Sequence, residues 1–99
     1  MSTAGISLST HVLDTGAGRP ADGVLVVLYR GDMFIVERRT DGDGRADIAD
    51  ELDPGTYRLV FHPPSPFFKR VELEVQLDDG HYHVPLLVSP YSCASYRGS

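Results

Sequence analysis

The chain contains a single cysteine, Cys93, and therefore forms no intrachain disulfide. Small extracellular domains often depend on disulfides, whereas proteins of reducing compartments do without them. No basic residue flanks Cys93 in the sequence. We therefore expect an inert, buried or half-buried thiol rather than a nucleophile.

Long apolar runs are also missing. No stretch approaches the roughly 20 apolar residues that cross a bilayer, and residues 1–5 have neither a basic region nor a long apolar core. The last residues, Arg97-Gly98-Ser99, differ from the Ser-Lys-Leu peroxisomal signal. We expect a cytoplasmic protein with no membrane partner.

Basic clusters are absent, and the overall charge is acidic. Nine Lys plus Arg residues stand against fourteen Asp plus Glu, for a net charge of −5. A surface that binds nucleic acid needs clustered cations to neutralise phosphates. We therefore expect no nucleic-acid partner.

What the chain does contain is enough for one folded domain, to which we assign residues 1–99. Hydrophobic residues make up 41% and charged residues 23% of the sequence, which is typical of a soluble globular protein and not of a disordered one. A chain of this length can bury a core without the support of disulfides or a metal.

Apolar residues recur at every second position along most of the chain, and no segment has a convincing helical period. Turn residues such as Gly31-Asp32 and Asp53-Pro54-Gly55 separate the alternating segments. The predicted strands cover residues 6–13, 24–30, 33–38, 56–61, 67–77 and 81–90; residues 46–52 form a short strand or a helical turn, and residues 91–96 a last strand or extended tail. Seven or eight short strands predict an all-β sandwich.

The strand from His81 to Pro90 has apolar groups on both faces. Its core-facing residues are Tyr82, Val84, Leu86 and Val88. The opposite row sets His81 and His83 beside Pro85 and Leu87, an arrangement that water would not favour unless something covers it. We infer that a partner subunit covers this row. A histidine in such a half-dry cleft can titrate near neutral pH.

The histidines allow a metal site as an alternative. His81 and His83 share a face about 7 Å apart, as paired zinc ligands do. His11 points away from the core and could supply a third ligand, although an outward imidazole is equally compatible with solvent. No carboxylate that would orient these rings is evident nearby in the sequence. We expect no metal here.

The tract Asp41-Gly42-Asp43-Gly44 is predicted to be a tight turn. It superficially suggests a calcium loop, but it lacks the acidic residue that closes an EF-hand. Arg45 follows directly. It is either a solvated surface cation or a planar donor fork for a carbonyl oxygen.

Three separated blocks now stand in a specific order: LSTHVLD at residues 8–14 with GRPA at 18–21, TDGDGR at 40–45, and HYHVPLLVSP at 81–90 with the terminus YRGS at 96–99. Together they resemble the 5-hydroxyisourate hydrolases, the transthyretin-related enzymes of urate breakdown, over nearly the whole chain. The terminal YRGS is the signature that separates these hydrolases from the hormone-carrying transthyretins. The resemblance implies a transthyretin-like two-sheet sandwich that assembles as a homotetramer, a dimer of dimers, with its active sites in the channel between the dimers.

The same resemblance implies the site residues. It assigns catalysis to His11, Arg45 and His83. The substrate-binding residues that it implies are His11, Arg45, Tyr96, Arg97 and Ser99. The implied substrate is the purine-derived ring of 5-hydroxyisourate, opened at a ring amide to 2-oxo-4-hydroxy-4-carboxy-5-ureidoimidazoline, with no metal or cofactor. His83, assisted by His11, would activate water while Arg45 stabilises the oxyanion; the sequence leaves open which imidazole is the base.

Two other classes of function are weighed against the enzyme. The first is a transthyretin-like protein that binds a small aromatic ligand in the same channel without chemistry, although a carrier of apolar rings would favour apolar groups over histidines and arginine. The second is a sandwich module with no site of its own. That module would be a monomer in solution, whereas the enzyme needs assembled subunits to form its cleft.

Overall fold

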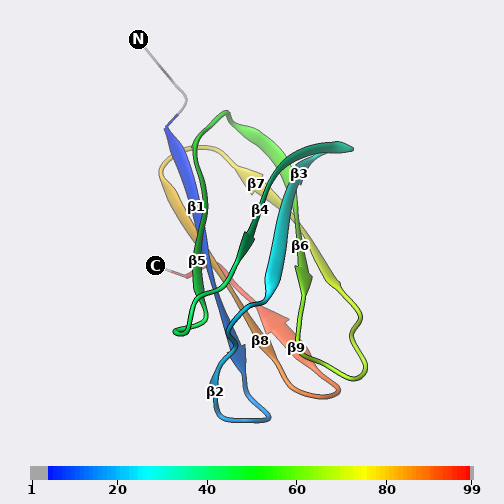
Figure 1. Cartoon of the computed structure of the whole chain (residues 1–99). Coiled ribbons are helices and arrows are strands. Elements are labelled where there is room, and N and C mark those ends of the chain that lie inside the picture. Colours follow the sequence, from blue (N-terminus) through cyan, green and yellow to red (C-terminus); the bar gives the residue numbers. More distant parts are fainter. Residues whose placement is uncertain (1–4, 99) are drawn as a thin grey trace.

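Residues 5–98, the part of the chain that this computed structural model describes, are built from strands packed as two facing sheets (Figure 1). The first sheet contains β1 (Ile6–Asp14), β2 (Arg19–Pro20), β5 (Arg45–Leu52), β8 (His81–Val88) and β9 (Cys93–Ser95). The second contains β3 (Leu25–Arg30), β4 (Met33–Arg39), β6 (Gly55–His62) and β7 (Val71–Leu77). The all-β sandwich is therefore confirmed. Seven of the described strands are six residues or longer, and β2 and β9 are shorter.

Strand β1 is the centre of the first sheet. It pairs in parallel with β8, and its other edge pairs antiparallel with β5 and, near its end, with β2. Strand β9 extends the sheet beyond β8. The second sheet is antiparallel throughout, in the order β4-β3-β6-β7. No helix within residues 5–98 is long and apolar enough to span a membrane.

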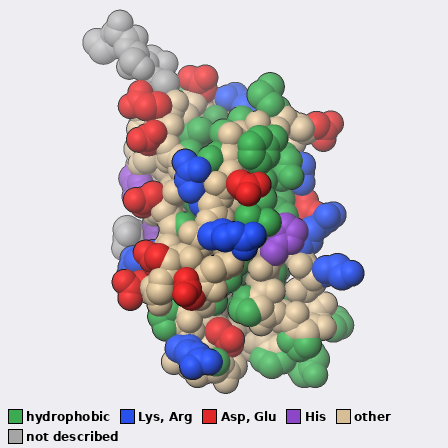
Figure 2. Space-filling view, viewed as in Figure 1, with side chains coloured by type: hydrophobic (Ala, Val, Ile, Leu, Met, Phe, Trp, Pro, Cys, Tyr) green, Lys and Arg blue, Asp and Glu red, His purple; other side chains and the backbone are tan. Residues whose placement is uncertain are grey.

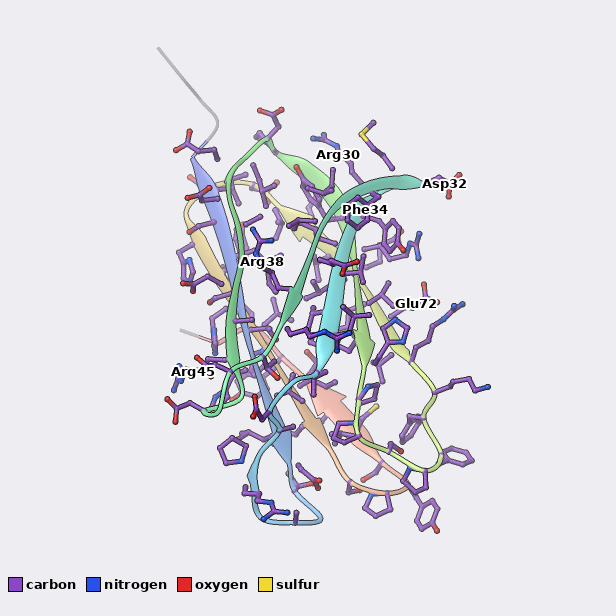
Figure 3. All side chains as sticks on the ribbon, viewed as in Figure 1. Arg30, Asp32, Phe34, Arg38, Arg45 and Glu72 are labelled. Atoms are coloured by element: carbon purple, nitrogen blue, oxygen red, sulfur yellow. The ribbon has the colours of Figure 1, made fainter. Side chains whose placement is uncertain are left out.

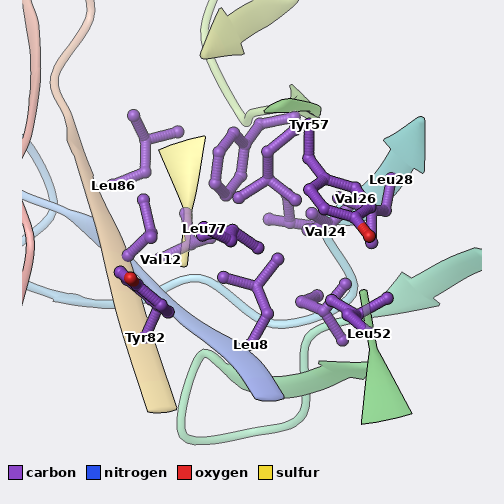
Figure 4. Close-up of a cluster of buried hydrophobic side chains, with 14 of the residues drawn as sticks. Leu8, Val12, Val24, Val26, Leu28, Leu52, Tyr57, Leu77, Tyr82 and Leu86 are labelled. Carbon is purple, nitrogen blue, oxygen red and sulfur yellow. The ribbon is translucent and has the colours of Figure 1, made fainter. Parts of the chain in front are cut away.

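The core lies between the two sheets and is formed by alternate residues of both (Figure 4). Its fully buried members include Leu8 and Val12 of β1, Leu28 of β3, Phe61 of β6 and Leu86 of β8. Removing such side chains from water is the main stabilising term of a sandwich. The predicted core rows of β1 and β8 are confirmed, and His11 and His83 consequently point away from the core.

Two segments differ from the predicted strands. Residues 46–52, for which a helical turn was the alternative, belong to the strand β5. The predicted strand from Phe67 is wrong in its first part, because β7 begins only at Val71. The hydroxyl of Ser65 accepts the backbone N–H groups of Phe67 and Phe68, and this local turn replaces ladder pairing.

Aromatic packing holds that loop at one end of the sandwich. The Phe67 ring lies 5.0 Å from the Phe68 centroid and 6.1 Å from that of Tyr91, and Ser65 donates to the Pro90 carbonyl. Figure 2 shows hydrophobic side chains exposed at the lower end of the molecule, where Figure 1 places the loops that follow β6 and β8.

Cys93 is exposed, so the expectation of a buried or half-buried thiol is wrong. The residue lies on β9, which forms the edge of the first sheet beyond β8. An edge strand has no neighbour to cover its outer side, and a three-residue strand offers little shelter to its own side chains.

A buried threonine ties the two ends of the β3–β4 hairpin to the loop before it. Thr40 is 4% exposed; its hydroxyl accepts the Val24 N–H at 2.9 Å and donates to the Ala21 carbonyl at 2.7 Å. Both backbone groups depend on this one hydroxyl for a buried partner. Losing a partner in such a place leaves the cost of desolvation uncompensated.

Thr40→Val should therefore lower the free energy of unfolding by about 2 kcal/mol, because it keeps the shape of the side chain but leaves the Val24 N–H and the Ala21 carbonyl without this partner. Urea unfolding at a fixed protein concentration measures the change. Thr56→Val is the matched control, since the Thr56 hydroxyl bonds to Gln76 at an exposed position, and it should change stability by no more than about 0.5 kcal/mol. Equal effects of the two substitutions would contradict the assignment.

Candidate active site

The parallel pairing of β1 with β8 brings two histidine-bearing segments side by side. In this register Ser7 lies opposite His81 and Ser9 opposite His83. On the other edge of β1, His11 lies opposite Arg45 of β5. These side chains belong to the outer face of the first sheet, the face turned away from the second sheet. Figure 3 shows Arg45 projecting from β5 on that side.

His11, Arg45 and His83, the three predicted catalytic residues, are thus brought together. The imidazole centroids of His11 and His83 lie 6.5 Å apart, with the rings tilted by 44°. His83 is half-buried. Burial, and then the nearby Arg45, His11 and His81, lower the pKa of His83 below its usual value, because each disfavours the imidazolium form. His83 is therefore neutral at neutral pH and able to accept a proton.

The turn before Arg45 is shaped by Asp41 and Gly44. The Asp41 carboxylate accepts the backbone N–H groups of Asp43 and Arg45, at 2.9 and 3.0 Å. The tract is a turn, as predicted. Gly44 has φ +77°, and a Cβ there would lie 2.5 Å from the Val12 carbonyl oxygen and 3.2 Å from Cδ2 of His11. Only glycine allows the loop to pack this tightly beside His11.

The terminal segment docks onto β8 rather than fraying. The N–H of Gly98 donates to the His83 carbonyl at 2.6 Å and forms a bridge with that strand. A Cβ on Gly98 would lie only 2.8 Å from Cδ2 of His83. Steric space therefore explains why a glycine stands at this position of the terminal signature, because only a residue without a Cβ lets the tail lie directly against the imidazole.

Tyr96 and Arg97 lie elsewhere in the single chain. Both line a hollow of about 470 Å³ between β7 and the β8–β9 side of the first sheet. The Arg97 guanidinium lies 4.0 Å from the centroid of the Tyr82 ring and donates to the His81 carbonyl. Tyr82 faces the core, so this is the opposite side of the sheet from the histidine pair. Contact of Tyr96 and Arg97 with substrate stays a prediction, and Ser99 lies outside the described residues.

Sequence reasoning missed the hydroxyl groups beside the histidines. Ser9 Oγ lies 2.8 Å from Nδ1 of His83 and 3.0 Å from Nε2 of His81, and Ser7 Oγ lies 2.6 Å from Nδ1 of His81. Alternation along β1 already places Ser7, Ser9 and His11 on one face. Their imidazole partners become evident only from the parallel register of β1 with β8.

The arrangement is suited to attack of water on a carbonyl group. A neutral imidazole can take a proton from water, a second imidazole lies within reach to assist, and a guanidinium can donate to a developing oxyanion. Within residues 5–98, no three His, Cys, Asp or Glu side chains are placed to hold a metal ion together.

Comparison with known proteins agrees with the family resemblance that the sequence motifs indicate. Residues 8–98 match the family described as the HIUase/Transthyretin family. The chain is 43% identical to "5-hydroxyisourate hydrolase 2" of Rhizobium meliloti and 42% identical to the 5-hydroxyisourate hydrolase of Deinococcus radiodurans; each match covers 93% of this chain and 95% of the relative.

Solved structures show the same fold. The 5-hydroxyisourate hydrolase of Klebsiella pneumoniae superposes with a TM-score of 0.87 at 33% identity, over 94% of this chain and 99% of that one. Transthyretin from Sparus aurata superposes with a TM-score of 0.80 at 25% identity, over 92% and 95% of the two chains. The transthyretin-like form of the predicted sandwich is confirmed.

Arg45→Gln should raise the pKa of His83 toward its usual value, because the substitution removes a positive charge that disfavours the imidazolium. An NMR titration of the His83 ring measures this shift directly. Arg70→Gln, which removes a cation from the loop before β7, is the control and should leave the titration unchanged. A His83 pKa that stays put or falls in Arg45→Gln would show that the guanidinium does not act on this imidazole.

Proposed function

This chain belongs to the HIUase/transthyretin family, and from that premise we propose that it hydrolyses 5-hydroxyisourate with His11, Arg45 and His83 as the reacting groups. Its activity is that of a 5-hydroxyisourate hydrolase, an enzyme of urate degradation, in keeping with the hydrolases that it matches over most of their length. The observation that carries the proposed mechanism is the meeting of a neutral, half-buried His83 with His11 and Arg45 on one face.

The proposed reaction adds water to a ring amide carbonyl of the substrate. Nδ1 of His83 is engaged by Ser9, so Nε2 is the nitrogen left to take the proton of the attacking water. Arg45 binds the substrate and donates to the carbonyl oxygen as it becomes negative. His11 orients the water or the ring. The C–N bond then breaks and the departing nitrogen is protonated, with no acyl-enzyme.

The lowered pKa of His83 suits this imidazole to the role of the base. A base must be unprotonated at the working pH, and burial together with Arg45 keeps His83 in that form. A carrier of apolar rings would have no use for such a group. The polar outer face therefore favours the enzyme over the small-ligand carrier, whose fold is the same.

We also propose that the enzyme is a homotetramer, a dimer of dimers, in which a second dimer covers the outer face of the first sheet. The support is an apolar stripe on that face: Leu87 lies opposite Leu13 on one side and opposite Ala94 on the other. Leu13 and Leu87 stay half-exposed in the single chain. Covering them would enclose the histidines. Residence in the cytoplasm stays a prediction from the sequence.

Replacement of either histidine by asparagine should lower kcat/KM strongly, for His83→Asn by roughly 10²–10⁴-fold, which is the usual contribution of a positioned base. Arg45→Ala should lose both substrate binding and oxyanion stabilisation, raising KM and lowering kcat. The ultraviolet decay of freshly generated 5-hydroxyisourate reports turnover. His62→Asn is the matched control, because His62 is exposed at the end of β6 in the second sheet. Retained turnover in both His11→Asn and His83→Asn would exclude the assignment.

Light scattering should give the wild-type protein a mass of about four times the 10.9 kDa chain. Leu87→Glu would place a charge in the apolar stripe and should yield a smaller species with reduced turnover. Thr56→Glu, at an exposed position of the second sheet, should keep the wild-type mass. A wild-type monomer with full turnover would rule out a site that depends on assembly.

A further inference from the structure

Four side chains of β1 and β8 form one continuous row on the outer face of the first sheet. In order they are Ser7, His81, Ser9 and His83, joined by contacts of 2.6, 3.0 and 2.8 Å. At one end of the row, His83 is half-buried in the site. At the other end, His81 and Ser7 lie near open solvent. Ser9 is the link in the middle, and it is only 8% exposed.

The hydroxyl of Ser9 has one proton and touches two imidazoles. When the Ser9 hydroxyl donates to Nε2 of His81, Nδ1 of His83 must carry a proton and donate it to the Ser9 oxygen. When the Ser9 hydroxyl donates to Nδ1 of His83 instead, Nε2 of His81 must carry the proton that is donated to the Ser9 oxygen. The hydrogen bonds of the row can therefore run in either of two directions. In the first direction Nε2 of His83 has a free lone pair and is a base. In the second, a neutral His83 carries its proton on Nε2 and is an acid.

The two ends of the row differ in their surroundings. His83 faces His11 of β1, Arg45 of β5 and its own neighbour His81, all of which disfavour an added positive charge, and it is half-buried. His81 is exposed. It lines a hollow of about 350 Å³ with Ser7, Arg38 of β4, and Asp47 and Asp50 of β5. Arg97 reaches only its carbonyl oxygen. A positive charge is thus better solvated at His81 than at His83.

We propose that Ser9 and His81 are positioning residues of the hydrolysis, which pass the positive charge of the accepted proton from half-buried His83 to exposed His81. The proposal rests on the proposed function. It adds a role for the first histidine of the HYH segment and for the serine two residues before His11. Without the row, each turnover would leave an imidazolium beside the Arg45 guanidinium.

The proton transfers balance in each half of the reaction. As the water oxygen bonds to the carbonyl carbon, its proton goes to Nε2 of His83; the Nδ1 proton of His83 passes to Ser9, and the Ser9 proton passes to Nε2 of His81, which becomes the imidazolium. When the C–N bond breaks, Nε2 of His83 protonates the departing nitrogen, and the two protons of the row return. The second proton of the water stays on the new carboxyl group and is lost to solvent.

Steady-state kinetics with freshly generated 5-hydroxyisourate test the row through two substitutions. Ser9→Ala breaks it, and His81→Gln keeps an acceptor for Ser9 but cannot hold the charge. We expect each substitution to lower kcat by at least about tenfold. The loss should not exceed the roughly 10²–10⁴-fold rate enhancement that a positioned base contributes, and KM should change less than about twofold. Ser9→Thr, which keeps the hydroxyl, should restore most of kcat.

Rates in mixtures of H₂O and D₂O separate a row of moving protons from a structural effect. The wild-type enzyme should show a curved dependence on the deuterium fraction, because several protons move together, and Ser9→Ala should show a linear one. Ser95→Ala is the control, since it removes a hydroxyl of the same sheet that bonds to the Pro85 carbonyl and touches no imidazole. Wild-type kcat in Ser9→Ala and His81→Gln, or a lower kcat with an unchanged curve, would overturn the proposal.

NMR titration of the His81 and His83 rings judges the row independently of turnover. The two titrations should be coupled in the wild-type protein, and the coupling should weaken in Ser9→Ala, where only the repulsion between the two charged rings remains. If the wild-type protein fails to hydrolyse 5-hydroxyisourate but the coupling is found, the proposed function fails and the hydrogen-bonded row stands. If the titrations are the same with and without the Ser9 hydroxyl, the row itself is refuted.

Discussion

The parallel pairing of β1 with β8 is the constraint on which the site depends. Its register sets Ser9 opposite His83 and places His11 within 6.5 Å of that ring. Because side chains in a strand alternate between faces, a shift of one residue would turn His83 into the core and expose its neighbours. The buried side chains of both strands hold the register, so the same packing that stabilises the sandwich aligns the reacting groups.

The remaining parts of the site are added to this pair from two directions. The turn at Gly44 delivers Arg45 beside His11, and the tail at Gly98 lies against the His83 ring. Both contacts require the absence of a Cβ. Arg45 then acts twice, since the charge that can stabilise an oxyanion also adds to the effect of burial in lowering the pKa of His83. The electrostatics of the site and its close packing are therefore parts of one arrangement.

Much of this was predictable from the sequence, for physical reasons that differ between segments. Period-two alternation identified the strands around His11 and His83 and their core rows, since burial on one face imposes that pattern. It failed at Phe67, where prolines and Ser65 favour a turn despite the alternation. It could not reveal the contacts of Ser9, because those depend on which strands pair. The reacting residues themselves were named by resemblance to a family, and alternation only showed that the two histidines face outward.

The central claim is that these outward imidazoles and the guanidinium of Arg45 perform hydrolysis. The most direct measurement is the decay of freshly generated 5-hydroxyisourate in the presence of the wild-type protein, compared with the same solution without protein. The account predicts a decay that is faster in proportion to the concentration of protein and that yields the ring-opened carboxylate. A decay equal to the spontaneous one, from a protein shown to be folded, would contradict it.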